Sequence, residues 1–294
     1  MDNPFEKYFA VKRGNSYFVD NLYRPETNFR ETNFALYATV RGKEHLIYNL
    51  KDVISLEGKI GEGSRNNFIG LIGERILSVV LDDLVMGAIE SLKSENPDAK
   101  ATGAVLMEKE EHIGKEFVAT YNSHYLLKHK GKSNFVILKK TALSTPFDWY
   151  QQEKSGLQAS EIDGLAYLHA DSNMYLLIGE SKMINSWKHS RYKEFCTSLK
   201  ESIVLPFKAL FPGHEFIFTF MGKESIIFEN NGSSNSNKLT DTSAELASIL
   251  VELGVKAIFV PLPHTPRPID EHANDMYEAL PLTREVLSII EKMI

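Results

Sequence analysis

The run EIDGLAYLHADSNMYLLIGESK, residues 161–182, predicts two β-strands joined by a tight turn. Aliphatic and aromatic side chains fill much of residues 161–169 and 174–182, whereas the polar residues 170–173 between them are typical of a turn. The second strand passes from the apolar residues Tyr175–Ile178 into the charged residues that end it. We therefore expect a hairpin with a buried apolar part that leads into a charged cluster.

Three charged side chains gather at that end of the hairpin. Asp163 lies on the first strand, and Glu180 and Lys182 lie two residues apart on the second, so the latter two project from the same face. In a hairpin, Asp163 approaches Glu180 across the ladder. Buried charges are costly unless they are paired or bound to a metal, and Mg²⁺ takes few oxygen ligands from the protein and the rest from water and phosphate. The pattern therefore predicts a divalent-metal site at Asp163 and Glu180.

Such a site favours hydrolysis of a phosphodiester bond. A bound metal ion lowers the pKa of a water molecule and stabilises negative charge on the phosphate. Lys182 is placed to orient or deprotonate that water, or to meet the negative charge that develops. The alternative is that Glu180 and Lys182 form a surface ion pair at a sheet edge, because such short triplets also occur by chance.

The residues Glu161-Ile-Asp163-Gly and Ile178-Gly-Glu180-Ser-Lys182 resemble the PD-(D/E)xK nuclease superfamily, in the form found in Holliday-junction resolvases. Ile162 stands where the motif name has proline. Gly73-Glu74 resembles the glutamate that family members carry on the first core helix. The resemblance implies Mg²⁺ or Mn²⁺ as the cofactor, Glu74 at the metal site directly or through water, and the carbonyl of Ser181 as a metal ligand. It covers residues 65–84 and 161–207 only.

The second half of the chain alternates strands with helices, which predicts an α/β fold with a mixed sheet. The resemblance implies that this is a restriction-endonuclease-like core, with a central mixed β-sheet flanked by helices, over residues 61–294. An insertion around residues 95–155 is needed to explain the long gap between Glu74 and Asp163. Residues 1–60 are expected to form a β-rich N-terminal segment or subdomain. The expected helices are 65–84, which continues to about Leu92, and 190–207, 242–253 and 283–293; the other expected strands are 34–40, 45–50, 117–121, 134–138, 215–221 and 256–261, and residues 58–63 are expected to be a linker.

Two groups of basic residues are candidates for contacts with nucleic acid. The resemblance implies that the start of helix 190–207 brings one group near the site, and a lysine-rich hairpin without acidic residues would carry the other. The alternatives are a solvated helix start and a sheet edge protected by lysines. The first group is Lys188, His189, Arg191 and Lys193, and the second is Lys128, Lys130 and Lys132. His264 and His272 lack tight metal-ligand spacing and are expected to be structural.

Composition limits the cellular compartment and the classes of partner that fit this chain. The net charge of −6 argues against a general nucleic-acid coat, since phosphate binding draws on Lys and Arg. The single cysteine, Cys196, excludes an intramolecular disulfide and a cysteine zinc cluster, and it fits a reducing compartment. The N-terminus lacks the features of a signal peptide, and no apolar run is long enough to cross a bilayer. We therefore expect a cytoplasmic protein without a membrane partner.

Three hypotheses about function follow. The first is a metal-dependent endonuclease that acts on DNA, with RNA not excluded, in prokaryotic restriction or anti-phage defence. Cleavage of both strands of a duplex would favour a homodimer by symmetry, and a defence-system partner protein is an alternative. The second is a catalytically inactive nuclease fold that binds nucleic acid or protein. The third is an interaction protein whose acidic surface faces a protein partner.

Overall fold

A mixed sheet of five strands forms the centre of the fold, in the order β15-β13-β12-β11-β6. The computed structural model describes residues 3–32, 35–49, 52, 62–105, 119–121, 124–128, 135–139, 160–183, 189–229 and 237–293. Strand β11 pairs antiparallel with both β6 and β12, whereas β12, β13 and β15 run parallel to one another. The strands are β6 (Ala101–Val105), β11 (Gly164–Ala170), β12 (Asn173–Lys182), β13 (Glu215–Gly222) and β15 (Lys256–Pro261). The predicted α/β class and mixed sheet are thus confirmed.

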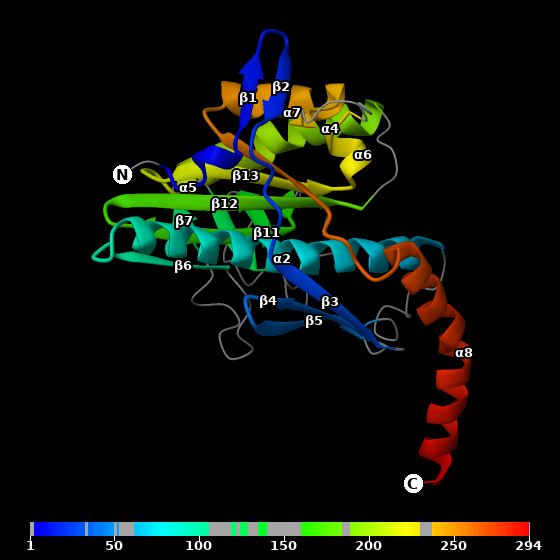
Figure 1. Cartoon of the computed structure of the whole chain (residues 1–294). Coiled ribbons are helices and arrows are strands. Elements are labelled where there is room, and N and C mark those ends of the chain that lie inside the picture. The colour runs from blue at the N-terminus through cyan, green and yellow to red at the C-terminus, as the bar shows by residue number, and fades with distance from the viewer. Residues whose placement is uncertain are drawn as a thin grey trace.

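Helices cover both faces of the central sheet (Figure 1). The long helix α2 (Glu62–Glu95) packs on one face, against β6, β11 and β12. The other face carries α4 (His189–Ser198), the π-helical segment η5 (Leu199–Val204), α5 (Leu205–Leu210) and α7 (Asp241–Glu252). Alternation along β12 feeds the two cores, because Tyr175 and Leu177 pack in the core with α2, whereas Leu176 and Ile178 pack in the core with η5 and α7.

Helix α2 is longer than the sequence pattern predicts, and Gly63 of the expected linker lies within it. Its middle is apolar around most of its circumference, and Ile76, Leu77, Val80, Leu81 and Val85 are fully buried. A helix that is apolar on all sides needs packing partners on more than one side. The second partner is a small antiparallel sheet of β3 (Thr27–Thr32), β4 (Ala35–Val40) and β5 (Lys43–Asn49), which lies across α2 from the central sheet (Figure 1).

The N-terminal segment is β-rich, as predicted, but it contributes to two different sheets. The expected hairpin of β4 and β5 turns at Arg41 and Gly42, whose φ angles of 46° and 80° match a two-residue primed turn. A short 3₁₀ turn, η1 (Glu6–Tyr8), precedes the hairpin of β1 (Ala10–Arg13) and β2 (Ser16–Val19). Strand β2 also pairs with β14 (Asn237–Lys238), which lies far along the chain. Long-range pairing of this kind leaves no local sequence signal.

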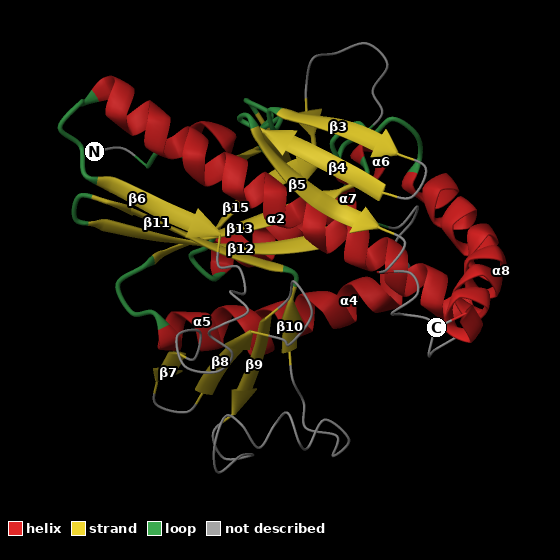
Figure 2. Cartoon of the chain, turned by 90° about the horizontal axis from the view of Figure 1, so that it is seen from below, coloured by secondary structure: helices red, strands yellow, loops and turns green. Residues whose placement is uncertain are grey.

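The described strands of the region expected as an insertion, residues 95–155, belong to two sheets. Strand β6 lies within it but forms the edge of the central sheet. A separate antiparallel sheet has the order β10-β9-β8-β7 and lies beside α5 (Figure 2). Its strands are β7 (Ala119–Tyr121), β8 (His124–Lys128), β9 (Phe135–Lys139) and β10 (Ser160–Ile162). The expected strand 161–169 is therefore broken at Asp163, where the chain leaves this sheet and enters the central one.

The C-terminal elements match the sequence pattern in type but not always in length. Thr240 caps α7, where its side chain accepts a hydrogen bond from the Ser243 amide at 3.3 Å, and Gly254 follows that helix with φ 63°. A short helix α6 (Glu224–Ile227) follows β13. Helix α8 (Ile269–Met293) begins well before the predicted residue 283 and projects beyond the body of the molecule (Figure 1). Within the described residues, no helix combines the length and hydropathy needed to span a membrane.

Candidate active site

Asp163 and Glu180 lie opposite each other where the hairpin of β11 and β12 ends. Gly164 pairs with Gly179, so the next step along the ladder brings Asp163 across from Glu180. The Asp163 amide donates to the carbonyl of Gly179 at 3.2 Å, and Asp163 Oδ2 accepts from the Ser181 amide at 2.7 Å. The backbone of β12 therefore fixes the Asp163 carboxylate at the break between the two sheets.

Lys182 completes the cluster on the same face of β12. Its Nζ donates to Glu180 Oε1, and it lies 5.4 Å from the centre of the Phe195 ring on α4. Phe195 thus supports the lysine from the helix side, a contact that the sequence pattern did not indicate. Asp163, Glu180 and Lys182 are brought together as the hairpin spacing predicts.

The surroundings of Glu180 disfavour its ionised form. Glu180 is only 5% exposed. Burial, the nearby charge of Asp163 and, less strongly, that of Glu74 raise the pKa of Glu180 to about 8, although Lys182 acts in the opposite direction. Burial disfavours the charged form of Lys182, but Glu180 and Asp163 outweigh it and raise the lysine pKa. Lys182 therefore stays protonated, and the ionised form of Glu180 is destabilised unless another cation approaches.

Glu74 approaches this cluster from α2 because Gly73 allows close packing. A Cβ on residue 73 would lie 2.4 Å from Met183 Cγ and 2.7 Å from Ser181 Oγ, closer than Cβ atoms pack. The absence of a side chain at Gly73 thus lets the helix contact the end of β12. The charge of Glu74 then contributes to the raised pKa of both Glu180 and Lys182.

The oxygen atoms at this site fit a hard divalent cation. The Ser181 amide points toward Asp163, and an extended residue directs its N–H and C=O to the same side of the strand, so its carbonyl also faces the Asp163 side. Across the described part of the chain, no three His, Cys, Asp or Glu side chains converge as a metal centre, so Glu74 does not join Asp163 and Glu180 as a third ligand side chain here. A metal ion here would draw on Asp163, Glu180, the Ser181 carbonyl and water, which is the kind of ligand set that Mg²⁺ accepts.

The predicted contacts to nucleic acid fall largely outside what the structure describes. Lys188, Lys130 and Lys132 lie outside the described residues. His189, Arg191 and Lys193 belong to α4 and Lys128 belongs to β8, but the placement of their side chains is also outside the description. These seven residues stay predictions. The two histidines expected to be structural differ, since His264 is exposed whereas His272 is buried, with its Nε2 at 2.8 Å from Glu31 Oε2.

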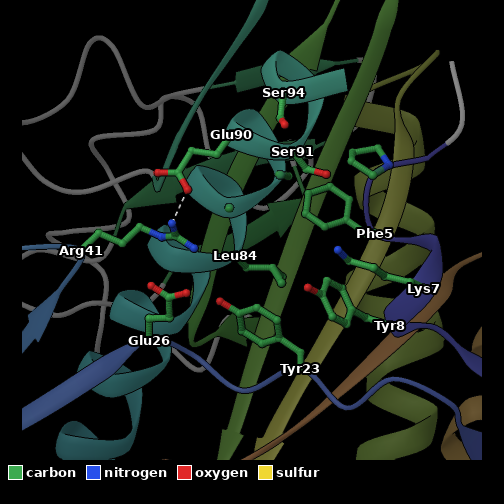
Figure 3. A pocket seen from close by; sticks show the side chains of 13 residues that line it. Phe5, Lys7, Tyr8, Tyr23, Glu26, Arg41, Leu84, Glu90, Ser91 and Ser94 are labelled. Atoms are coloured by element: carbon green, nitrogen blue, oxygen red, sulfur yellow. Dashed lines mark hydrogen bonds and ion pairs between the residues drawn. The ribbon is translucent and has the colours of Figure 1, made fainter. Parts of the chain in front are cut away.

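A second charged region, which the sequence did not suggest, lies near the other end of α2 (Figure 3). A cavity of about 330 Å³ is lined there by Tyr23, Glu26, Arg41 and Glu90, among others. Beneath it, Asp83 is 1% exposed. Asp83 accepts hydrogen bonds from the Tyr23 hydroxyl, from the Glu26 amide at 3.1 Å and from Arg41 Nε at 2.7 Å. This carboxylate is matched by donors on both oxygens, which indicates a structural role.

The chain was compared with protein-family models, with curated proteins and with solved structures, and no match was found in any of the three comparisons. The function therefore has to be argued from the chemistry of the Asp163, Glu180 and Lys182 cluster.

Proposed function

We propose that this chain is a metal-dependent endonuclease that hydrolyses phosphodiester bonds in nucleic acid, with DNA as the expected substrate. One observation carries the proposal: Glu180 is buried opposite Asp163, with Lys182 as its hydrogen-bond donor. Asp163 is only half-buried, but burial of Glu180 and the charge of Asp163 together disfavour ionisation of the Glu180 carboxyl. A site that bears such a cost and also presents a lysine at the end of β12 fits metal-assisted catalysis better than structural support.

The residues of the cluster take distinct roles in this proposal. Asp163, Glu180 and the Ser181 carbonyl would hold Mg²⁺ or Mn²⁺, which would activate a water molecule and neutralise charge on the phosphate. The Ser181 amide keeps Asp163 in position. Lys182 donates to Glu180 in the structure, and with a metal ion bound its ammonium group would orient the water or meet the charge on the phosphate. Glu74 acts on the same site from α2.

The order of elements supports the restriction-endonuclease-like core as part of the proposal. Helix α2 packs directly on the hairpin of β11 and β12, and the charge of Glu74 acts on the residues that resemble the family motif. Helix α4 and segment η5 follow β12 and cover the opposite face of the sheet, as the resemblance implies for the helix to Phe207. The four-strand sheet of β7–β10 then stands as the elaboration of this core, in place of the whole stretch 95–155.

Cleavage of circular substrates tests the proposal. Supercoiled plasmid and a single-stranded circle are incubated with Mg²⁺ or Mn²⁺, with and without EDTA. We expect metal-dependent nicking or linearisation, which requires an endonuclease because circles have no ends. The Lys182→Ala change should lower the rate by about 10²–10⁴-fold, since the lysine contributes to proton transfer or charge stabilisation.

A matched variant separates this effect from a general loss of positive charge. Lys200 is an exposed lysine on η5, and Lys200→Ala should cleave like the wild type. Equal rates for the wild type and Lys182→Ala would remove Lys182 from the chemistry. Metal-independent binding without any cleavage would instead favour the inactive nucleic-acid-binding module.

A further inference from the structure

A groove lies near the candidate active site, at the same end of the strands of the central sheet. Lys182, Gly222 and Pro261 stand side by side at the ends of the parallel strands β12, β13 and β15. The next residue of each strand, Met183, Lys223 and Leu262, lines the groove. The loop 263–268 and the first residues of α8 complete it, and its volume is about 400 Å³. Ligands of α/β sheets bind in crevices at the carboxyl ends of strands, which is where this groove lies.

The groove combines apolar walls with a rigid frame. Leu262, Ile269 and the side chains of Pro263, Pro266 and Pro268 supply apolar surface. Arg267 holds the loop in place, because its Nη2 lies 2.6 Å from Glu31 Oε1 and its Nη1 pairs with Asp275. Thr265 Oγ1 also donates to the Arg267 carbonyl at 2.8 Å. A slot of this size and character suits one flat apolar group with polar edges.

Lys223 provides a cation in the groove. Its Nζ lies 3.7 Å from Asp270 Oδ2, and its side chain is 32% exposed. Gly222 of β13 pairs with Lys182 of β12, and Lys223 is the next residue after β13. Because strand side chains alternate, Lys223 projects from the opposite face of the sheet to Lys182, at the same end of the strands. A single strand that crosses this end of the sheet from a phosphate at Asp163 and Glu180 therefore passes Lys223.

We propose that this groove accepts an unpaired base next to the scissile phosphate, so that the substrate is a single strand or a single-stranded region. This inference rests on the proposed function, and it names the substrate class. Proteins that bind single strands combine basic contacts to the backbone with surfaces for the faces of bases. A base inside a duplex is stacked and paired, and it cannot enter a slot with walls formed by a proline-rich loop.

The charge of the chain supports a single strand over a duplex. Duplex binding without base contacts draws on many phosphate contacts by Lys and Arg, whereas this chain has a net charge of −6. The groove itself offers Lys223 beside the acids Glu224 and Asp270. Affinity therefore has to come from contacts with the base.

Fluorescence anisotropy tests the groove in EDTA, where metal-dependent cleavage is blocked. The probes are a short labelled oligodeoxythymidylate, the same backbone with abasic sites, and a duplex of equal length. We expect the base-bearing strand to bind roughly 5–100-fold more tightly than the abasic strand, because stacking of one base contributes about 1–3 kcal/mol. The duplex should bind more weakly than the base-bearing single strand.

Two variants locate the binding in this groove. Lys223→Ala should weaken binding of the base-bearing and the abasic strand alike and reduce the slope of log K against log salt by about 0.7, as loss of one phosphate contact requires. Lys256→Ala is the matched control, since Lys256 is exposed at the opposite end of β15. Thr265→Trp fills the groove and should abolish the preference for base-bearing over abasic strand. Thermal unfolding of each variant establishes that it is folded.

The outcomes separate this inference from the proposed function. Equal affinity for base-bearing and abasic strands, tighter binding of the duplex, or no binding at all overturns the groove, even if circles are cleaved in the presence of metal. A base preference that Thr265→Trp abolishes supports the groove, even if no circle is cleaved, and in that case only the hydrolytic proposal fails. A preference that survives in Thr265→Trp also overturns the groove.

Discussion

Two deeply buried carboxylates, Asp83 and Glu180, lie on or beside helix α2. They differ in the charges and hydrogen-bond donors that surround them. Asp83, on the helix itself, receives donors on both oxygens from Tyr23, Glu26 and Arg41. Glu180, at the end of β12 that α2 contacts through Gly73, receives Lys182 but faces Asp163. Their exposure is nearly the same, at 1% and 5%. Burial alone therefore does not distinguish a candidate catalytic carboxylate from a structural one, whereas the charges and donors around each carboxylate do differ.

The partners of Asp83 show what a satisfied buried charge does in this fold. Tyr23 and Glu26 belong to the N-terminal segment, and Arg41 belongs to the turn between β4 and β5. Asp83 thus connects both of these to α2 at one point. Burial and the hydrogen bond to Asp83 raise the pKa of the Tyr23 hydroxyl, so the phenol stays protonated as a donor. The Asp83 network stabilises the fold. The ionised form of Glu180, in contrast, reduces stability, and a carboxyl with a shifted pKa of this kind is a candidate for catalysis.

The largest expected effect is at Asp83. Asp83→Ala should lower the free energy of unfolding by about 3–5 kcal/mol, because it leaves the Tyr23 hydroxyl and the Glu26 amide without their buried acceptor and breaks the ion pair with Arg41. Urea denaturation measures the change. Asp82→Ala is the matched control, since Asp82 is a partly exposed neighbour on the same helix, and it should change stability by less than about 0.5 kcal/mol. A small effect of Asp83→Ala would remove the contrast with Glu180.

Replacement of Glu180 should raise the free energy of unfolding, in contrast to replacement of Asp83. The pKa of Glu180 is raised from 4.5 to about 8, so the folded state holds a proton that the unfolded state releases between these pH values. Stability from this group is therefore complete below pH 4.5, declines as pH rises to about 8, and is constant above that. Glu180→Gln should raise the free energy of unfolding at pH 8 by roughly 1–3 kcal/mol, with little gain at pH 4.5.

Urea midpoints of the wild type and Glu180→Gln at several pH values measure this difference. Subtracting one profile from the other removes the titration of the groups that do not interact with Glu180, and leaves that of Glu180 and its neighbours Asp163 and Lys182. A gain at pH 8 together with loss of cleavage would show that the site reduces stability for the sake of chemistry. A variant less stable than the wild type at both ends of the range would mean that Glu180 is a structural acid like Asp83.

The sequence predicts those parts of the site that depend on local geometry. Glu180 and Lys182 share a face because strand side chains alternate, and the polar turn at residues 170–173 is sufficient to predict the hairpin. The middle of α2 is also visible as an apolar helical repeat. The same locality makes the cap at Thr240 recognisable, because the capping contact spans only three residues.

Features that depend on distant partners are not predictable in this way. The strand predicted for residues 161–169 breaks at Asp163 because β10 pairs with β9 in another sheet. The pairing of β2 with β14 and of β6 with β11 joins segments with no shared pattern. In the sequence, Asp83 has the pattern of an ordinary helix acid, and only the tertiary structure brings Arg41 and Tyr23 to it. These contacts are set by tertiary packing, which local propensity does not encode.

The smallest expected effects concern the glycines that let α2 approach its neighbours. A Cβ at Gly73 would collide with Met183 and Ser181, at Gly87 it would meet only Arg41 Nη2 at 3.0 Å, and at Gly70 it would meet nothing within 4 Å. Gly73→Ala should cost about 1 kcal/mol, the lower end of overpacking effects, because the unbranched Met183 can move. Gly70→Ala should gain about 0.5–1 kcal/mol from helix propensity alone.

Cleavage should separate these variants more sharply than stability does. Gly73→Ala moves Glu74 and Ser181 relative to Asp163, and displacements of about 1 Å in an active site cost up to roughly 10²-fold in rate. Gly87→Ala lies at the Asp83 end, where Arg41 is a flexible side chain, and it should cleave like the wild type, as should Gly70→Ala. Nicking rates at equal folded concentration measure the difference. If Gly73→Ala cleaves as fast as Gly70→Ala, the close contact of α2 with β12 serves packing alone, and Glu74 has no part in the chemistry.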